Sequence, residues 1–314
     1  MWALVFPGQG SQFLGMGKDF YEEFSKVKEI FKRAEEITEI PITKLVFQGP
    51  MEELTLTENL QVCLTVVNIS IYEGFREKVG ENVLKEKVSF VAGHSLGEFS
   101  ALYANEVLSL EDTLLAVKKR GELMGKAGKN KPSGMYAIIN FPQERLEEIL
   151  RVSQGSVIIS NFNSPNQLVI SGLEPKLSEV ANEIKKEGGK VIKLKVSAGF
   201  HSPLMQEAEE EFSAFLETLT FKTPKITFVS NVSGKGEVDA IEIKELMKKQ
   251  ITSPVRWIDV VEHIHTQGVS IFVEVGPKEV LKGLISQILK DLPFKCYSIG
   301  NIETVEDTLK EIYH

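Results

Sequence analysis

The sequence predicts an α/β protein with a parallel-sheet, hydrolase-like large domain and an inserted ferredoxin-like small domain. Two observations lead to this fold class. Short apolar runs alternate with amphipathic helical segments in the first and last parts of the 314-residue chain, a rhythm typical of a parallel sheet covered on both faces. In the middle the order becomes strand, helix, strand, strand, helix, strand, which is the ferredoxin-like order.

The large domain is predicted to comprise residues 1–126 and 199–314. Apolar runs of strand length and segments of helical periodicity alternate through both parts. The expected strands are 2–6, 87–91, 225–232, 270–275 and 295–299, and the main expected helices are 19–38, one after residue 59, 98–108, 110–124, 206–219 and 278–290.

The small domain is predicted to comprise residues 127–198, after a glycine-rich and lysine-rich loop at 125–132. Gly188 is suited to stop its second helix before the last strand. A cleft between two domains is a common place for a small-molecule site. The expected strands are 135–140, 156–161, 167–171 and 190–196, and the expected helices are 143–152 and 174–187.

Composition excludes several classes of protein. A net charge of -8 offers no broad basic face for nucleic acid. Cys63 and Cys296 lie far apart in apolar stretches, so we expect core residues and not a disulfide or a metal site. The chain enters a strand directly after Met1, which is not a signal-peptide pattern. The uncharged run at 59–72 is too short to span a bilayer. We therefore expect a cytoplasmic monomer that binds no membrane.

The most informative motif is Gly-x-Ser-x-Gly at residues 93–97. It lies between an expected strand and an expected helix, the context of a nucleophile elbow, in which a sharp turn exposes the serine. A glycine-rich turn without chemistry is the alternative. The position in the fold favours Ser95 as a nucleophile.

A serine nucleophile needs a base, and His201 is the strongest candidate. It follows the last small-domain strand and precedes the helix at 206–219. His94 is set aside because a tight turn should point it away from Ser95. The remaining histidines are His263 and His265, expected on a surface helix, and the terminal His314.

An acidic third member of the site is not evident. Asp112 and Asp239 are possible, but no local pattern supports either. Since the third group mainly sets the tautomer and ring direction, a backbone carbonyl or an amide could replace it.

Arg120 lies at the edge of the apolar stripe of the expected helix 110–124. A guanidinium beside the core needs a partner, and its planar fork matches a carboxylate. That carboxylate is either an ordinary glutamate or part of a substrate. The sequence leaves both open.

The loop Pro7-Gly8-Gln9-Gly10-Ser11-Gln12 follows the first expected strand. It lacks the dinucleotide-binding spacing, because Phe13 replaces the third glycine. It is either a tight turn or a source of N–H groups for an oxyanion, with the amide after Ser95 as the second donor.

Several segments together resemble the bacterial malonyl-CoA:acyl carrier protein transacylase family, the acyltransferases of type II fatty acid synthesis. The resemblance covers nearly the whole chain. It rests on Phe-Pro-Gly-Gln-Gly-Ser-Gln at 6–12, Gly-His-Ser-Leu-Gly-Glu at 93–98, Phe-His-Ser-Pro-Leu-Met at 200–205, Gln250 with Pro-Val-Arg-Trp at 254–257, and Phe-Val-Glu-Val-Gly-Pro at 272–277.

The resemblance implies a role for each matching residue. Ser95 would take the malonyl group as an ester, His201 would be the base, and Arg120 would bind the malonyl carboxylate. The main-chain carbonyl of Gln250 would orient His201. Gln9 and Leu96 would supply oxyanion-hole N–H groups, and Phe200, Met124 and Asn163 would contact substrate, with Phe200 crowding an α-methyl group. Gly199 and Ala198 depart from the related polyketide pattern.

The implied reaction is ping-pong malonyl transfer from malonyl-CoA to the pantetheine thiol of acyl carrier protein, supplying fatty acid synthesis. Coenzyme A enters as a thioester substrate, and no metal or other cofactor is implied. The alternatives are a serine thioesterase or esterase with the same Ser-His pair, a stand-alone polyketide-type acyltransferase, and a non-catalytic carrier-binding subunit. Candidate carrier-docking lysines are Lys118, Lys119, Lys126, Lys129, Lys131, Lys185, Lys186, Lys190 and Lys193.

Overall fold

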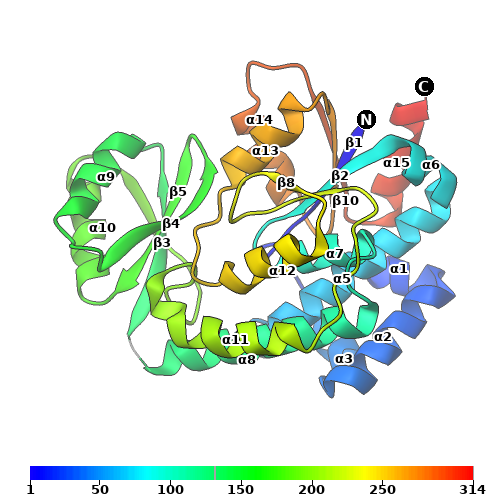
Figure 1. The fold of residues 1–314 in the computed structure, drawn as a ribbon, viewed down its shortest axis with the longest axis horizontal. Coiled ribbons are helices and arrows are strands. Elements are labelled where there is room, and N and C mark those ends of the chain that lie inside the picture. The colour runs from blue at the N-terminus through cyan, green and yellow to red at the C-terminus, as the bar shows by residue number, and fades with distance from the viewer. Residues whose placement is uncertain (131, 314) are drawn as a thin grey trace.

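A computed structural model describes residues 1–130 and 132–313, with the side chains of residues 129, 130 and 313 left out. Two sheets form two lobes (Figure 1). The larger sheet has the order β10-β9-β1-β2-β7-β8 and is parallel except for β8, which pairs antiparallel with β7. Its strands are β1 (Trp2–Phe6), β2 (Val88–Gly93), β7 (Thr227–Val229), β8 (Gly236–Glu237), β9 (Ile271–Val275) and β10 (Lys295–Ile299).

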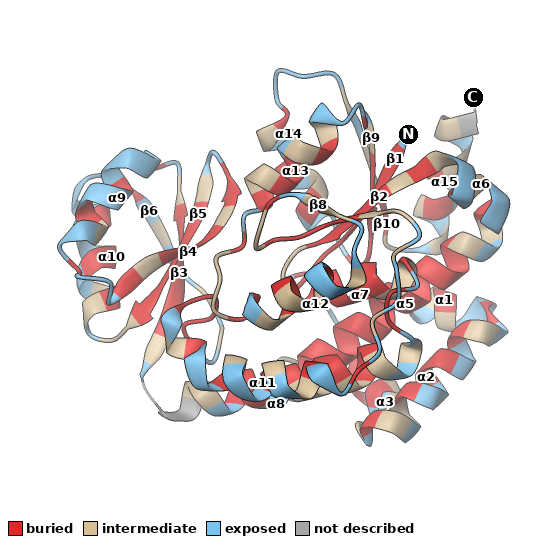
Figure 2. Cartoon of the chain, viewed as in Figure 1, coloured by how far each residue is buried: buried red, intermediate tan, exposed pale blue. Residues whose placement is uncertain are grey.

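Both faces of this sheet are buried, as its mostly apolar strands predict. In β1, Leu4 and Phe6 join the core on the α5 side, whereas Ala3 and Val5 join the core under α13 and α14. Figure 2 shows buried residues concentrated in these strands and in α5 and α7. The helices are α1 (Lys18–Glu23), α2 (Ser25–Thr38), α3 (Ile42–Phe47), α4 (Met51–Leu54), α5 (Thr57–Val79), α6 (Glu81–Lys87), α7 (Gly97–Ala104), α8 (Leu110–Asn130), α11 (Gln206–Glu217), α12 (Ala240–Lys249), α13 (Trp257–Thr266), α14 (Val280–Ile288) and α15 (Ile302–Tyr313).

The smaller sheet has the order β4-β5-β3-β6 with every pair antiparallel. Two helices cover it and share a separate apolar core with it. The predicted β-α-β-β-α-β order is therefore confirmed, and so is the α/β fold class. The elements are β3 (Ser133–Ile139), α9 (Gln143–Arg151), β4 (Val157–Ser164), β5 (Gln167–Leu173), α10 (Lys176–Lys186) and β6 (Lys190–Lys193).

Two sequence predictions about helix bounds are wrong. The helix expected at 19–38 is broken at Phe24, which is extended so that it packs with Phe20 against Gly74 of α5. The loop expected at 125–132 is helical as far as Asn130. Gly128 allows close packing there, since a Cβ on it would lie 2.3 Å from the carbonyl oxygen of Ser197. The proposed domain boundary at 126–127 thus lies inside α8, and Lys131 lies outside the described residues.

Backbone hydrogen bonds join the small lobe to the large one. The Phe162 N–H in β4 donates to the Val255 carbonyl oxygen at 2.8 Å, and the Val255 N–H donates to Ser160 at 2.9 Å. This junction follows Gln250 by only a few residues, so it sets the small lobe beside the predicted site. Within the described ranges, no helix is both long and apolar enough to cross a membrane.

Candidate active site

Ser95 occupies a strained turn between β2 and α7. Its φ of 49° lies in the left-handed region, which is costly for a residue with a side chain and typical of a nucleophile elbow. The flanking glycines are required by space. A Cβ on Gly97 would lie 2.0 Å from the Phe6 carbonyl oxygen, and one on Gly93 would lie 2.0 Å from the Gly97 carbonyl carbon. The motif therefore forms the strand–turn–helix that its sequence predicts.

His201 lies directly beside the serine, with Nε2 2.7 Å from Ser95 Oγ. Its Nδ1 is 3.0 Å from the carbonyl oxygens of Gln250 and Ser253. Both carbonyls can only accept, so the ring proton resides on Nδ1 and the Nε2 lone pair accepts the Ser95 hydroxyl hydrogen. Burial, reinforced by the charge of Arg120, lowers the pKa of His201 to about 3. The ring is a neutral base.

Neither aspartate considered as a third member reaches the histidine. Asp239 accepts the N–H groups of Ile241 and Glu242 at the start of α12, and Asp112 lies in the first turn of α8. The Gln250 and Ser253 carbonyls orient the ring instead. Such carbonyls set the tautomer without adding a charge.

Arg120 is fully buried, not at the edge of a helix face. Its Nε and Nη2 donate to Gln250 Oε1 at 3.1 and 2.9 Å, and its Nη1 donates to Gln61 Oε1 at 2.8 Å. Nη2 also lies 3.1 Å from Ser95 Oγ. Burial lowers the pKa of Arg120 to about 10, and the charge of Glu98 opposes that shift.

No described carboxylate forms an ion pair with Arg120. The ordinary glutamate that the sequence left open as its partner is therefore absent from contact. A guanidinium whose neighbours are neutral amides is suited to receive an anion, because its fork binds a carboxylate in two charge-assisted bonds.

Three polar residues of this site were missed by the sequence reasoning: Gln61, Glu98 and Asn231. Asn231 Oδ1 accepts the Ser95 N–H at 2.7 Å, and its Nδ2 donates to the Gly93 carbonyl at 2.7 Å. Asn231 thus holds the strained elbow from both sides. It follows β7, the neighbour of β2, and a polar residue at the end of that strand was the available signal.

The predicted oxyanion donors lie close together. A Cβ on Gly8 would be 2.4 Å from the His94 carbonyl oxygen and 3.6 Å from Leu96 N, so the loop after β1 packs directly on the elbow. Among the described residues, the N–H groups of Gln9 and Leu96 have no acceptor. Both remain available for a ligand oxygen.

A cavity of about 260 Å³ opens onto Ser95 and His201 between the two lobes. Gln9, Phe200 and Asn163 line it, with Leu194 and Val196 from the small lobe. Met124 does not line this cavity; its Sδ accepts from Gln61 Nε2 at 3.3 Å and so supports the residue that holds Arg120.

The His94 ring makes its hydrogen bond to Asn163 and not to Ser95, although His94 and Ser95 line the same cavity. His94 lines the same cavity as Ser95 because its ring turns toward the small lobe, where Nε2 lies 2.7 Å from Asn163 Oδ1. Burial lowers the pKa of His94. The ring contacts Asn163 and not the nucleophile, so His201 alone is placed as base among the histidines of the described residues.

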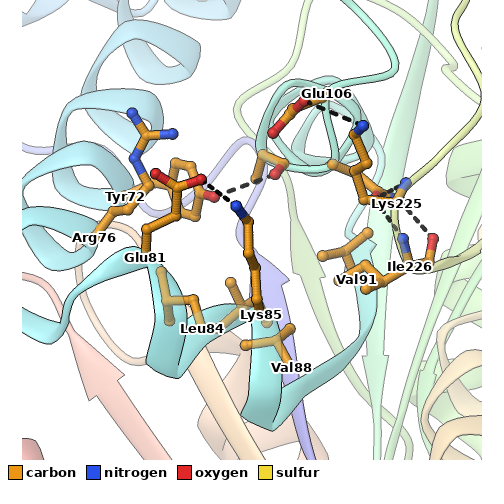
Figure 3. A pocket seen from close by; sticks show the side chains of 13 residues that line it. Tyr72, Arg76, Glu81, Leu84, Lys85, Val88, Val91, Glu106, Lys225 and Ile226 are labelled. Atoms are coloured by element: carbon orange, nitrogen blue, oxygen red, sulfur yellow. Dashed lines mark hydrogen bonds and ion pairs between the residues drawn. The ribbon is translucent and has the colours of Figure 1, made fainter.

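A larger cavity of about 510 Å³ lies elsewhere, between α5, α6 and the start of β7 (Figure 3). Each charged group that lines it has an ion-pair partner: Lys85 pairs with Glu81 at 2.6 Å, Lys225 with Glu106 at 3.8 Å, and Arg76 with Glu73 at 2.8 Å. It contains no paired nucleophile and base. Size alone therefore does not identify the site.

Comparisons with known proteins agree with this geometry. A family model described as Acyl transferase domain matches residues 3–308. The chain is 39% identical to the malonyl CoA-acyl carrier protein transacylase of Bacillus subtilis (strain 168), over 98% of this chain and 97% of that protein. It is 38% identical to the protein of the same name from Haemophilus influenzae, over 98% of both.

Solved structures are similar along the whole chain. The malonyl CoA-acyl carrier protein transacylase of Clostridium perfringens superposes with a TM-score of 0.91 at 34% identity, covering 99% of this chain and 97% of that one. A malonyl-transacylase in complex with its type II PKS acyl-carrier protein gives a TM-score of 0.92 at 35% identity, covering 99% of both chains.

Proposed function

The chain belongs to the acyl transferase domain family, and from that premise we propose that it transfers a malonyl group from coenzyme A to the pantetheine thiol of an acyl carrier protein. One observation supports this most strongly. Ser95 Oγ lies between a neutral base, His201 at 2.7 Å, and a buried cation, Arg120 at 3.1 Å, that has no carboxylate partner among the described residues. A simple esterase needs the base but not the cation.

In the loading step, His201 Nε2 takes the Ser95 hydroxyl proton as Oγ attacks the thioester carbonyl of malonyl-CoA. The N–H groups of Gln9 and Leu96 donate to the oxyanion that forms. The C–S bond then breaks, and the departing coenzyme A sulfur takes the proton from His201. Malonyl remains as an ester on Ser95, with its free carboxylate on Arg120.

In the transfer step, the carrier's pantetheine thiol gives its proton to His201 and attacks the ester carbonyl. The C–O bond to Ser95 breaks, and His201 returns the proton to Oγ. Because one site serves both thiols in turn, ping-pong kinetics follow. The reaction needs no metal or redox group, since coenzyme A enters as the substrate thioester. A cytoplasmic location and a monomeric state remain predictions from the sequence.

Intact-protein mass spectrometry tests this function. After exposure to malonyl-CoA, the protein should gain the mass of one malonyl group, and a holo carrier should remove that mass as malonyl-carrier with little free malonate. Rapid release of malonate without a carrier would favour a thioesterase or esterase. The absence of any adduct or turnover would favour a non-catalytic carrier-binding subunit.

Replacing Arg120 with alanine should lower the rate of malonyl loading by about 10²-fold, because the malonyl carboxylate loses its charge-assisted bonds. Acetyl loading should fall by much less, since an acetyl group carries no anion for Arg120. Both rates are measured on the same variant by single-turnover mass spectrometry, so misfolding affects both equally. Equal losses would refute an anion-binding role.

Two exposed lysines adjacent in sequence to a residue that lines the cavity give a test of carrier docking. Exposed Lys193 and Lys195 flank Leu194, which lines the cavity. Reversing both charges should lower carrier turnover about tenfold at low salt, while loading from malonyl-CoA is unchanged. Reversal of exposed Lys185 and Lys186 on α10 is the matched control. Equal effects of the two pairs would disprove a docking role specific to Lys193 and Lys195. Of the lysines considered earlier, Lys126 pairs with Glu211, while Lys131 and the side chain of Lys129 lie outside the described residues.

A further inference from the structure

A closed ring of hydrogen bonds includes the nucleophile. Its members are Ser95, Arg120, Gln250, Glu98 and Asn231. From Arg120 the ring passes to the side chain of Gln250, whose Nε2 donates to Glu98 Oε2 at 2.6 Å. Glu98 Oε1 accepts the Asn231 N–H at 2.7 Å, and Asn231 Oδ1 accepts the Ser95 N–H at 2.7 Å. Arg120 Nη2 closes the ring at Ser95 Oγ.

The Gln250 amide has every hydrogen-bonding position occupied. Its oxygen accepts twice from Arg120, and its nitrogen donates to the Ser95 carbonyl at 2.8 Å and to Glu98. Arg120 can only donate, whereas an ionised carboxylate and a carbonyl can only accept. Glu98 therefore acts with Arg120 and the Ser95 carbonyl to fix the amide with its oxygen toward Arg120.

Glu98 also places a negative charge near Arg120, and that charge opposes the lowering of the Arg120 pKa by burial. It is fully buried, two hydrogen bonds away from Arg120, and acts on it through the Gln250 amide. Burial raises the pKa of Glu98 to about 7, opposed by the bonds from Asn231 and Gln250 and by the charge of Arg120. Each oxygen of Glu98 accepts one hydrogen bond, from the Asn231 N–H and from Gln250 Nε2, which matches the ionised form.

Resting on the proposed malonyl transfer, we propose that Glu98 is a positioning residue for substrate selection: through the Gln250 amide it holds the Arg120 guanidinium aligned for the malonyl carboxylate. It touches neither substrate nor the reacting atoms. Its substitution should therefore reduce the preference for malonyl over acetyl, and not merely the stability of the fold.

Glu98→Gln is the sharpest test because it keeps the shape and removes the charge. In either orientation of the new amide, its NH₂ group meets a donor, the Asn231 N–H or the Gln250 NH₂. We expect the ratio of malonyl to acetyl loading, each as kcat/KM, to fall about tenfold. The Gln250 main-chain carbonyl still faces His201, so acetyl loading should fall less than malonyl loading.

Glu274→Gln is the matched control. Glu274 is equally buried and accepts two backbone N–H groups, from Leu281 at 3.0 Å and Lys282 at 2.8 Å. Burial also raises its pKa to about 7. The same chemical change there should lower the unfolding temperature without changing the malonyl to acetyl ratio.

A double-mutant cycle links the effect to Arg120. In an Arg120→Ala background, Glu98→Gln should change the ratio less than about twofold, since the group that it positions is gone. An unchanged ratio in Glu98→Gln, or an equal drop with and without Arg120, would overturn the proposal. If Glu98→Gln does not fold, Gln250→Met breaks the same connection from the other side and keeps the main-chain carbonyl; it should show the same loss of ratio, and an unchanged ratio would again overturn the proposal.

The failure of this inference is distinguishable from the failure of the proposed function. Wild-type protein that does not load malonyl at all would refute the function. Wild-type protein that prefers malonyl, together with a Glu98→Gln variant that prefers it equally, would refute only the role of Glu98.

Discussion

Ser95→Ala should leave no malonyl adduct and should lower malonyl transfer to the carrier by on the order of 10⁴-fold or more. The reason is that the acyl group is held by a covalent bond to Ser95 Oγ during transfer. Without Oγ there is no atom to hold the acyl group between the two thiols, and the base at 2.7 Å has no proton to remove. Intact-protein mass spectrometry after malonyl-CoA exposure, with a carrier discharge assay on the same sample, measures both effects.

Ser100→Ala provides a matched control for this prediction. Ser100 is a buried serine in α7, and its hydroxyl accepts from Asn68 Nδ2 at 3.3 Å outside the cavity. Loss of that hydroxyl should leave the adduct intact. A full-size adduct on Ser95→Ala would place the nucleophile elsewhere and end the proposal for Ser95.

Much of the fold and the nucleophile could be predicted because they depend on local patterns. The alternation of apolar runs predicts the parallel sheet, and two close glycines around a serine predict the elbow that Ser95 forms at φ 49°. The family resemblance implied the facing carbonyl of Gln250, which lies 3.0 Å from His201 Nδ1. Each of these features can be predicted because a short sequence motif indicates it directly.

The missed residues depend on contacts between distant segments. Asn231 and Glu98 are 133 positions apart, and Gln61 and Arg120 are 59 apart, so no local spacing indicates either pair. The phase of the helix placed Arg120 at the edge of an apolar stripe, whereas α5 and the Gln250 segment cover it completely. Similarly, the glycines at 125 and 128 resembled a loop signal, although Gly128 serves close packing inside α8.

The burial of Arg120 explains why selectivity and reactivity are connected in this site. The same Nη2 that suits a substrate carboxylate lies 3.1 Å from Ser95 Oγ before any substrate binds. We propose that Nη2 stabilises the negative charge that develops on Ser95 Oγ during attack. After acylation the ester oxygen is a weaker acceptor, so Nη2 can bind the malonyl carboxylate while Nε and Nη1 keep their bonds to Gln250 and Gln61. One cation can thus act at both stages.

His201→Ala should lower the rate of malonyl loading by on the order of 10³-fold, because Ser95 loses the base that removes its proton. Single-turnover loading followed by mass spectrometry measures this rate. His263→Ala is a control, since the His263 ring accepts the Gly236 N–H at 3.1 Å and lies outside the cavity. Added imidazole should restore part of the rate to His201→Ala. A loss of less than about tenfold would contradict the assignment of His201 as base.

The pH dependence of loading distinguishes this buried histidine from an exposed one. An ordinary histidine gains a proton near pH 6.5, but His201, with its pKa lowered to about 3, stays neutral and competent as a base from pH 5 to pH 8. We therefore expect no loss of loading from His201 as the pH falls through 6.5.

A decrease in the rate of malonyl loading below about pH 7 should instead report Glu98, whose ionised form supports Arg120 above its raised pKa of about 7. Glu98→Gln should remove that decrease. The contribution of His201 to the free energy of unfolding should decrease below about pH 6.5, because unfolded chains then bind a proton at this histidine that the folded protein does not. The raised pKa values of Glu98 and Glu274 contribute in the opposite direction as the pH falls below about 7. Loading that follows a pKa near 6.5 in both wild type and Glu98→Gln would show that the histidine is charged and exposed in solution, contrary to its position between Ser95 and the Gln250 carbonyl.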